Sequence, residues 1–160
     1  MNASSEEQIL NTLDDLSRLE SAMAAYYLAC SENWKGQSSL WMDLALEEER
    51  HERVLQNLSR VVRTHPDQFE QGLDIESTTI MSYIDNITEM TTDIRKGKVA
   101  LDEALAFALG IEESIIESRF FGIIISRNRK YLRFMEAMDH DLANHRRRIM
   151  EEMERIKGKG

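Results

Sequence analysis

The sequence predicts an all-α protein, a four-helix bundle made of two antiparallel helical hairpins joined by a long crossover. Two observations predict this class. Apolar residues recur at alternating spacings of four and three through most of the chain, the pattern of a helix with one buried face. The 160 residues include one proline and seven glycines, so few turns interrupt this pattern. The length suits one domain with a sizeable core, so residues 1–160 are treated as a single domain.

The first hairpin is expected to reach from the N-terminal region to about Arg63. A capping box, a serine followed three residues later by Glu or Gln, can begin the first helix at Ser4 or Ser5. Gly36 is a natural helix end, and Ser38 can cap the second helix. The inward residues of the first helix are Ile9, Leu13, Leu16, Glu20, Met23 and Tyr27. Those of the second are Leu44, Glu48, His51, Leu55, Leu58 and Val62.

Residues 64–99 form the expected crossover, which contains a short extra helix that ends near Gly97. The third helix is predicted to start around Val99, and a polar turn at 127–129 precedes a fourth helix over residues 130–157. The inward residues of the third helix are predicted to be Ala106, Leu109, Glu113, Ile116, Phe120 and Ile123. Those of the fourth are Met138, Leu142, His145, Ile149, Met153 and Ile156.

Ionisable residues interrupt these apolar faces. Glu20, Glu48 and Glu113 each occupy a position that otherwise favours leucine, and His51 follows Glu48 by one helical turn. Buried charges cost several kcal/mol unless they are paired or bound to metal, so a pair of metal ions is the leading explanation. Glu47 points about 100° away from Glu48 on an ideal helix and is expected to lie outside the site.

The fourth helix completes the set with Asp141 and His145. The spacing of 28 residues from Glu20 to Glu48 recurs from Glu113 to Asp141, which suggests a duplicated hairpin. Four carboxylates supply the charge needed to balance two divalent ions. The duplicated spacing would make Asn144 the counterpart of His51 in the second hairpin. The apolar stripe instead favours His145, and we follow the stripe. An isolated Glu-x-x-His on a charged helix usually lies on the surface and binds no metal. The prediction therefore depends on acids occurring on all four inward faces.

The chain resembles the rubrerythrin and ferritin-like di-iron family over most of its length. The resemblance is carried by Glu20 with Tyr27, the segment 46–51, Glu113 and the segment 141–145. It implies a ferritin-like bundle whose two non-haem irons are bound by Glu20, Glu48, His51, Glu113, Asp141 and His145. Glu48 and Asp141 would bridge the irons, although Asp141 stands where the longer Glu is usual. Another divalent metal remains an alternative.

The resemblance also implies oxidation of ferrous iron by peroxide or dioxygen, in peroxide detoxification or iron handling. The chain lacks the Cys-x-x-Cys pairs of a rubredoxin module, so an electron donor would be a separate protein. Whether the protein is an enzyme stays open. The alternatives are a degenerate bundle with one metal or none that serves as a structural or partner-binding module, and iron storage in a multi-subunit shell. A homodimer or larger homo-oligomer is expected.

Composition argues against other classes of function. The formal net charge is −9 with both signs interspersed, so nucleic acid is not an expected partner. The most apolar short run, residues 120–125, is far shorter than the roughly 20 residues of a membrane span. The polar residues 1–8 show no targeting signal, and the single cysteine, Cys30, gives no intramolecular disulfide. A cytoplasmic location is therefore expected.

Overall fold

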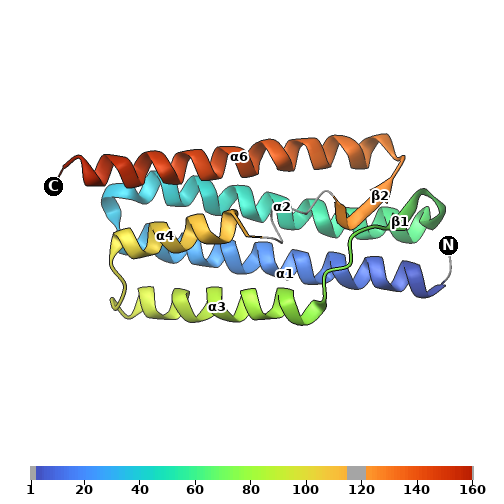
Figure 1. Cartoon of the computed structure of the whole chain (residues 1–160), viewed down its shortest axis with the longest axis horizontal. Coiled ribbons are helices and arrows are strands. Elements are labelled where there is room, and N and C mark those ends of the chain that lie inside the picture. Colours follow the sequence, from blue (N-terminus) through green and yellow to red (C-terminus); the bar gives the residue numbers. More distant parts are fainter. Residues whose placement is uncertain (1–2, 115–121, 160) are drawn as a thin grey trace.

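The computed structural model describes residues 3–114 and 122–159, which are mostly helical, and the all-α class is thereby confirmed. The α-helices within these ranges are α1 (Ala3–Asn33), α2 (Ser38–Thr64), α3 (Ser77–Arg95), α4 (Leu101–Glu112) and α6 (Arg129–Lys157). They are joined in part by short 3-10 turns, η1 (Lys35–Gln37) and η2 (Pro66–Gln68), and by the strands β1 (Phe69–Gln71) and β2 (Ile124–Ser126). The helices α1, α2, α4 and α6 run alongside one another, and α3 lies along α1 (Figure 1).

The antiparallel helices α1 and α2 supply much of the core. All the residues expected on the inward faces of these two helices are buried. The turn between them falls at η1, which contains Gly36, and α2 begins at Ser38 as the sequence predicts. Trp41 is fully buried near the start of α2, with its ring centroid 5.8 Å from that of Tyr27 in a stacked arrangement. The long apolar faces of α1 and α2 therefore form a large part of the core on which the other helices pack.

The crossover contains the short helix that the sequence predicts. Helix α3 packs on α1 through Ile80, Ile87 and Ile94, which are fully buried. Gly97 follows the end of α3 with φ of +68°, a conformation that residues with a side chain rarely adopt. Together, α3 and Gly97 return the chain to the end of the molecule where α4 begins (Figure 1).

A two-stranded antiparallel sheet, which the sequence did not indicate, joins the crossover to the segment before α6. Phe69 pairs with Ser126 and Gln71 with Ile124. The contact continues at Gly72, whose backbone N–H donates to the Ile123 carbonyl at 2.8 Å. A Cβ atom at Gly72 would lie 2.0 Å from the Gly122 carbonyl oxygen, so only glycine permits this approach. Residues 122–123 are helical, but the expectation that only a polar turn separates Ile123 from the last helix is wrong, because Ile124–Ser126 form β2.

Helix α4 is shorter than predicted. It begins at Leu101 and ends at Glu112, where a turn at residues 113–114 interrupts the continuous helix expected from residue 99. Arg146 of α6 donates from Nη1 to the Glu112 carbonyl at 3.3 Å and so caps the end of α4. Two residues expected on the inward face, Ile116 and Phe120, lie outside the described residues.

Helix α6 runs antiparallel to α2 and follows the sequence prediction closely (Figure 1). The Asn128 side chain caps its start by accepting from the backbone N–H groups of Lys130 and Tyr131 at 3.0 and 3.1 Å. The predicted inward residues Met138, Leu142, His145 and Ile149 are buried. Within residues 3–114 and 122–159, every helix is too short or too polar to serve as a membrane span.

Candidate metal centre

Five ionisable side chains from α1, α2, α4 and α6 meet in the interior. Their relative exposure lies between 0 and 3%. They are Glu20 on α1, Glu48 and His51 on α2, Glu112 on α4 and His145 on α6. Because ionised groups are rarely buried without compensation, a cluster of this kind in a core is a candidate functional site.

The first half of the cluster lies between α1 and α2. The Nδ1 atom of His51 is 3.1 Å from Glu48 Oε2 and 3.6 Å from Glu20 Oε2. Each of these three residues offers a ligand atom within 4.8 Å of the others. Two carboxylates and an imidazole at this separation can bind one divalent cation.

The second half uses the other oxygen of the same carboxylate. The Nδ1 atom of His145 is 3.1 Å from Glu48 Oε1 and 3.2 Å from Glu112 Oε1. These residues again offer ligand atoms within 4.8 Å of one another. The two imidazole rings are stacked, with centroids 5.8 Å apart and planes inclined by 28°. Glu48 therefore joins two equivalent groups, each completed by one further Glu and one His.

Two further carboxylates contact the outer nitrogens of the histidines. Asp141 Oδ2, on α6, lies 3.0 Å from His51 Nε2 on α2. Glu47 Oε2, on α2, lies 2.5 Å from His145 Nε2 on α6. Each helix thus supplies an acid that contacts the histidine of the other helix. A carboxylate on the outer nitrogen fixes the orientation of an imidazole whose inner nitrogen is free to face a metal.

Histidine charge offsets the buried acids. Burial by itself would lower the pKa of His51, but hydrogen bonds and negative charge from Glu20 and Glu48 outweigh this and raise the pKa to about 11. The pKa of His145 is raised for the same reason, against the effect of its burial, by Glu112, Glu47 and Glu48. Without a metal, both imidazoles are therefore protonated on both nitrogens and positively charged near neutral pH.

The two inner carboxylates on the His145 side behave differently. Burial opposes ionisation of Glu48, yet hydrogen bonds from Glu20 and both histidines hold its pKa below the usual value. At Glu112, burial dominates and raises the pKa. Its Oε1 atom accepts the Tyr27 hydroxyl at 2.5 Å, whereas Oε2 is buried with no hydrogen-bond partner among the described residues. A buried carboxylate oxygen without a partner is costly, and a cation would satisfy it.

The structure places most of the predicted site residues together but corrects one of them. Glu113 is exposed, and its neighbour Glu112 occupies the cluster. Residues 104–111 are apolar or glycine throughout, so periodicity did not define the buried face of this helix. The four-three spacing drawn from Ala106 to Ile123 and the 28-residue spacing both selected Glu113, and an error of one residue turns a helix face by about 100°. Ala106 is likewise exposed, while Ala104 and Ala108 are buried.

The structure also shows where Asp141 and Asn144 lie relative to the cluster. Asp141 is half-buried and contacts the outer nitrogen of His51, so it does not occupy the bridging position that the resemblance implied. Asn144 accepts from Arg147 Nη2 at 2.6 Å away from the cluster, and His145 points inward as the apolar stripe predicts. The 28-residue spacing therefore does not mark equivalent positions in the two halves.

Besides Glu112, sequence reasoning missed Glu47. It was expected to point away from the site, yet it contacts His145 across the space between α2 and α6. A signal was present in the sequence: Glu47 precedes His51 by four residues, just as Asp141 precedes His145 by four. The repeated acid-x-x-x-His spacing marks Glu47 and Asp141 as equivalent positions, although it does not reveal that each contacts the histidine of the other helix.

Comparison of the chain with protein-family models, with curated proteins and with solved structures finds no match. The functional interpretation therefore depends on the geometry of the cluster.

Proposed function

We propose that the protein is a ferritin-like four-helix bundle that binds two metal ions, in the manner of a non-haem di-iron protein of the rubrerythrin type. One observation carries this proposal. Glu48 is buried between two Glu–His groups and directs a different oxygen to each histidine. A carboxylate in that position can bridge two cations, and bundle-core metal sites of this class combine glutamates with Glu-x-x-His motifs.

The side chains fit such a pair of ions. Glu20, Glu48 and His51 would hold one ion, and Glu48, Glu112 and His145 the other. Mixed oxygen and imidazole donors suit iron, manganese and zinc, and the unpartnered Glu112 Oε2 supplies a ligand atom already in the interior. Each histidine would lose its Nδ1 proton to bind, while its Nε2 proton stays on the hydrogen bond to Asp141 or Glu47.

When bound, two redox-active ions would supply electron transfer to peroxide or dioxygen. The residues around them have other tasks. Glu20, Glu48 and Glu112 carry negative charge that balances the ions, and their burial keeps bulk water from the centre. The Tyr27 hydroxyl holds Glu112 in position. With a separate protein as electron donor, the centre would act as an oxidoreductase of peroxidase or ferroxidase type.

Metal loading tests this function. Purified chain, stripped of metal and titrated anaerobically with ferrous iron, is expected to bind two ions per chain. Addition of peroxide is then expected to produce the near-ultraviolet absorption of a ferric carboxylate centre. Absence of binding by ferrous iron, manganese and zinc alike would contradict the proposal.

A structural or partner-binding module without metal is the second candidate. The observation that favours it is that both nitrogens of each core histidine already face carboxylates. The cluster is therefore compensated internally by ion pairs. Leu142, which follows Asp141 as Glu48 follows Glu47, supplies no second bridging carboxylate. A folded protein whose melting temperature does not change on addition of metal would support this alternative.

A further inference from the structure

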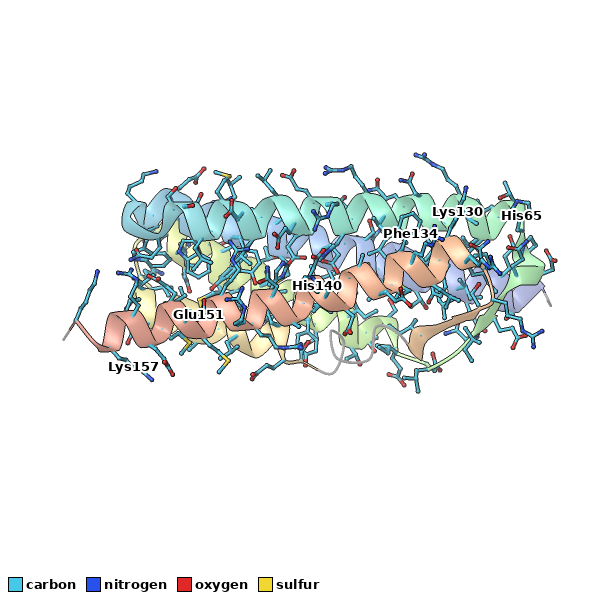
Figure 2. All side chains as sticks on the ribbon, turned by 90° about the horizontal axis from the view of Figure 1, so that it is seen from above. His65, Lys130, Phe134, His140, Glu151 and Lys157 are labelled. Carbon is cyan, nitrogen blue, oxygen red and sulfur yellow. The ribbon has the colours of Figure 1, made fainter. Side chains whose placement is uncertain are left out.

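The contact between α2 and α6 is where the buried cluster reaches solvent. Seven side chains make up the cluster when the two outer carboxylates are included. Five of them are almost fully buried. In the part of the chain that the structure describes, the members that reach solvent are Asp141 and Glu47, whose side chains are 21% and 23% exposed. Figure 2 looks down on α2 and α6, with His140 labelled near the middle of α6.

Each outer carboxylate spans the distance from solvent to a core histidine. Asp141 Oδ2 is 3.0 Å from His51 Nε2, and Glu47 Oε2 is in direct contact with His145 Nε2. In the interior, fully buried Tyr27 donates to Glu112 Oε1, and fully buried Trp41 stacks on the Tyr27 ring. A cation held by Asp141 or Glu47 would therefore be one side chain away from the buried ligands.

Arginines occupy the solvent side of the same two carboxylates. Arg50 Nη2 lies 2.6 Å from Asp141 Oδ2, and the exposed His140 approaches the other oxygen at 4.0 Å. Arg148 lies 3.5 Å from Glu47 Oε1 and 3.1 Å from Asp43 Oδ2. The Arg50 side chain is 53% exposed, and that of Arg148 is 19% exposed, so both pairs reach solvent but the Arg148 pair is more enclosed. Ion pairs that reach solvent contribute less free energy than fully buried ones, and exposed side chains exchange rotamers rapidly. Guanidinium groups can therefore give way to an arriving cation of higher charge.

We propose that Asp141 and Glu47 form the entry point for divalent cations, with Arg50 and Arg148 as exchangeable counterions that close it. An incoming ion displaces a guanidinium group, is held by the outer carboxylate, and then moves inward to the Glu–His groups. Clustered negative charge of this kind raises the local concentration of cations and their rate of association. This role depends on the proposed function, because it requires the inner groups to bind metal.

The test separates the rate of loading from the number of ions bound. Metal-free protein is mixed anaerobically with Co²⁺ in a stopped-flow instrument, and the ligand-field absorption of bound Co²⁺ is followed. The double variant Glu47→Gln with Asp141→Asn keeps an oxygen acceptor for each Nε2 proton but removes both charges. We expect it to load about tenfold more slowly. Its affinity at equilibrium should also fall, because the outer carboxylates orient the histidines, but a loss of affinity through faster dissociation does not slow loading. The double variant Arg50→Gln with Arg148→Gln is expected to load several-fold faster.

Matched controls remove the same number of charges, of the same sign, away from the contact between α2 and α6. Glu151→Gln with Glu154→Gln removes two exposed negative charges from α6, and Arg53→Gln with Arg147→Gln removes two exposed positive ones. Both control variants should load at the wild-type rate. An acidic double variant that loads as fast as wild type would overturn the entry role. Wild-type protein that binds no Co²⁺ at equilibrium would overturn the metal centre itself, so the two failures are distinguishable.

Discussion

The two halves of the cluster share the same chemistry but rest on different supports. Glu20 and His51 lie in the middle of α1 and α2, two long helices that pack along their inward faces. Glu112 is the last residue of α4, and its partner His145 lies on α6. Residues in the middle of packed helices hold ligand geometry better than residues at a helix end. The difference indicates that the Glu20–His51 half is the more preorganised site and should bind the first ion more tightly.

Glu48 is common to both halves, so its replacement has the largest expected effect. Glu48→Gln keeps the shape of the side chain but removes the shared charge and one donor oxygen. We expect the iron content, measured by elemental analysis after reconstitution, to fall from two ions per chain to below one. The metal-free variant should also unfold more easily, by roughly 3 kcal/mol, because removing one partner of a buried ion pair leaves the others uncompensated.

If the Glu48→Gln variant kept the wild-type iron content, Glu48 would not be a shared ligand, and the division of the cluster into two halves would be wrong. Leu142→Gln is a useful contrast, since it alters the corresponding position of α6 and should not reduce iron content through loss of a ligand.

Replacing each histidine in turn should show which half binds metal more tightly. His145→Ala is expected to leave one ion bound with nearly wild-type affinity, because the Glu20–His51 half stays intact. His51→Ala should also leave one ion, but with at least tenfold weaker affinity, because only the half at the end of α4 remains. Titration calorimetry with Mn²⁺ measures both quantities. Equal residual affinities would show that the helix end holds its ligands as well as the long hairpin does.

The same contrast explains what the sequence could and could not predict. Helix α2 is strongly amphipathic, so the inward positions of Glu48 and His51 followed from periodicity alone. In α4 nearly every residue before Glu112 is apolar, so several registers were equally compatible with the pattern, and Glu113 was chosen in error. The short sheet was missed because Phe69–Gln71 and Ile124–Ser126 pair across a long sequence separation. Three-residue strands carry too little pattern to reveal such a contact.

The contacts of Glu47 and Asp141 were beyond periodicity for a different reason. Both lie at the border between the buried and exposed faces of their helices, where an amphipathic pattern says little about direction. Their role emerges only when α2 and α6 are brought together, since each acid contacts a histidine of the other helix. Local patterns predict which face is buried, but they do not predict which side chains from different helices meet.

The stabilisation that metal confers should increase with pH. Without metal, the raised pKa of His51, about 11 against an ordinary value of 6.5, contributes stability that is complete below about pH 6.5. This contribution declines as the pH rises toward 11. The raised pKa of buried Glu112 acts in the same direction, because ionising it in the core becomes costly as the pH rises. Metal-free protein should therefore lose stability between about pH 6.5 and 9.

Metal binding replaces a proton on each imidazole, so loaded protein should not share this loss. The difference in unfolding free energy between loaded and metal-free protein is expected to grow by about 1.4 kcal/mol per pH unit for each proton displaced. Thermal unfolding of the Zn²⁺-loaded and chelator-treated protein at about pH 6, 7 and 8 would measure it. A constant difference across this range would mean that the histidines bind metal without losing a proton, which is incompatible with Nδ1 as the ligand.

The smallest expected effect is confined to one half and concerns the hydroxyl of Tyr27. Tyr27→Phe removes the hydrogen bond to Glu112 Oε1, which is the contact that fixes the carboxylate at the end of α4. We expect the second ion to bind roughly tenfold more weakly while the first is unaffected, because an outer contact that orients a ligand is worth about that factor. Tyr131→Phe is the matched control, since it removes a buried hydroxyl that donates to the Ile124 carbonyl at 2.8 Å, away from the cluster. Both variants should lose about 1 kcal/mol of stability, as expected for one buried hydrogen bond. Weakening of both ions by Tyr27→Phe would mean that Glu112 supports the whole centre, and the two halves would then be one cooperative unit rather than a tight site beside a weaker one.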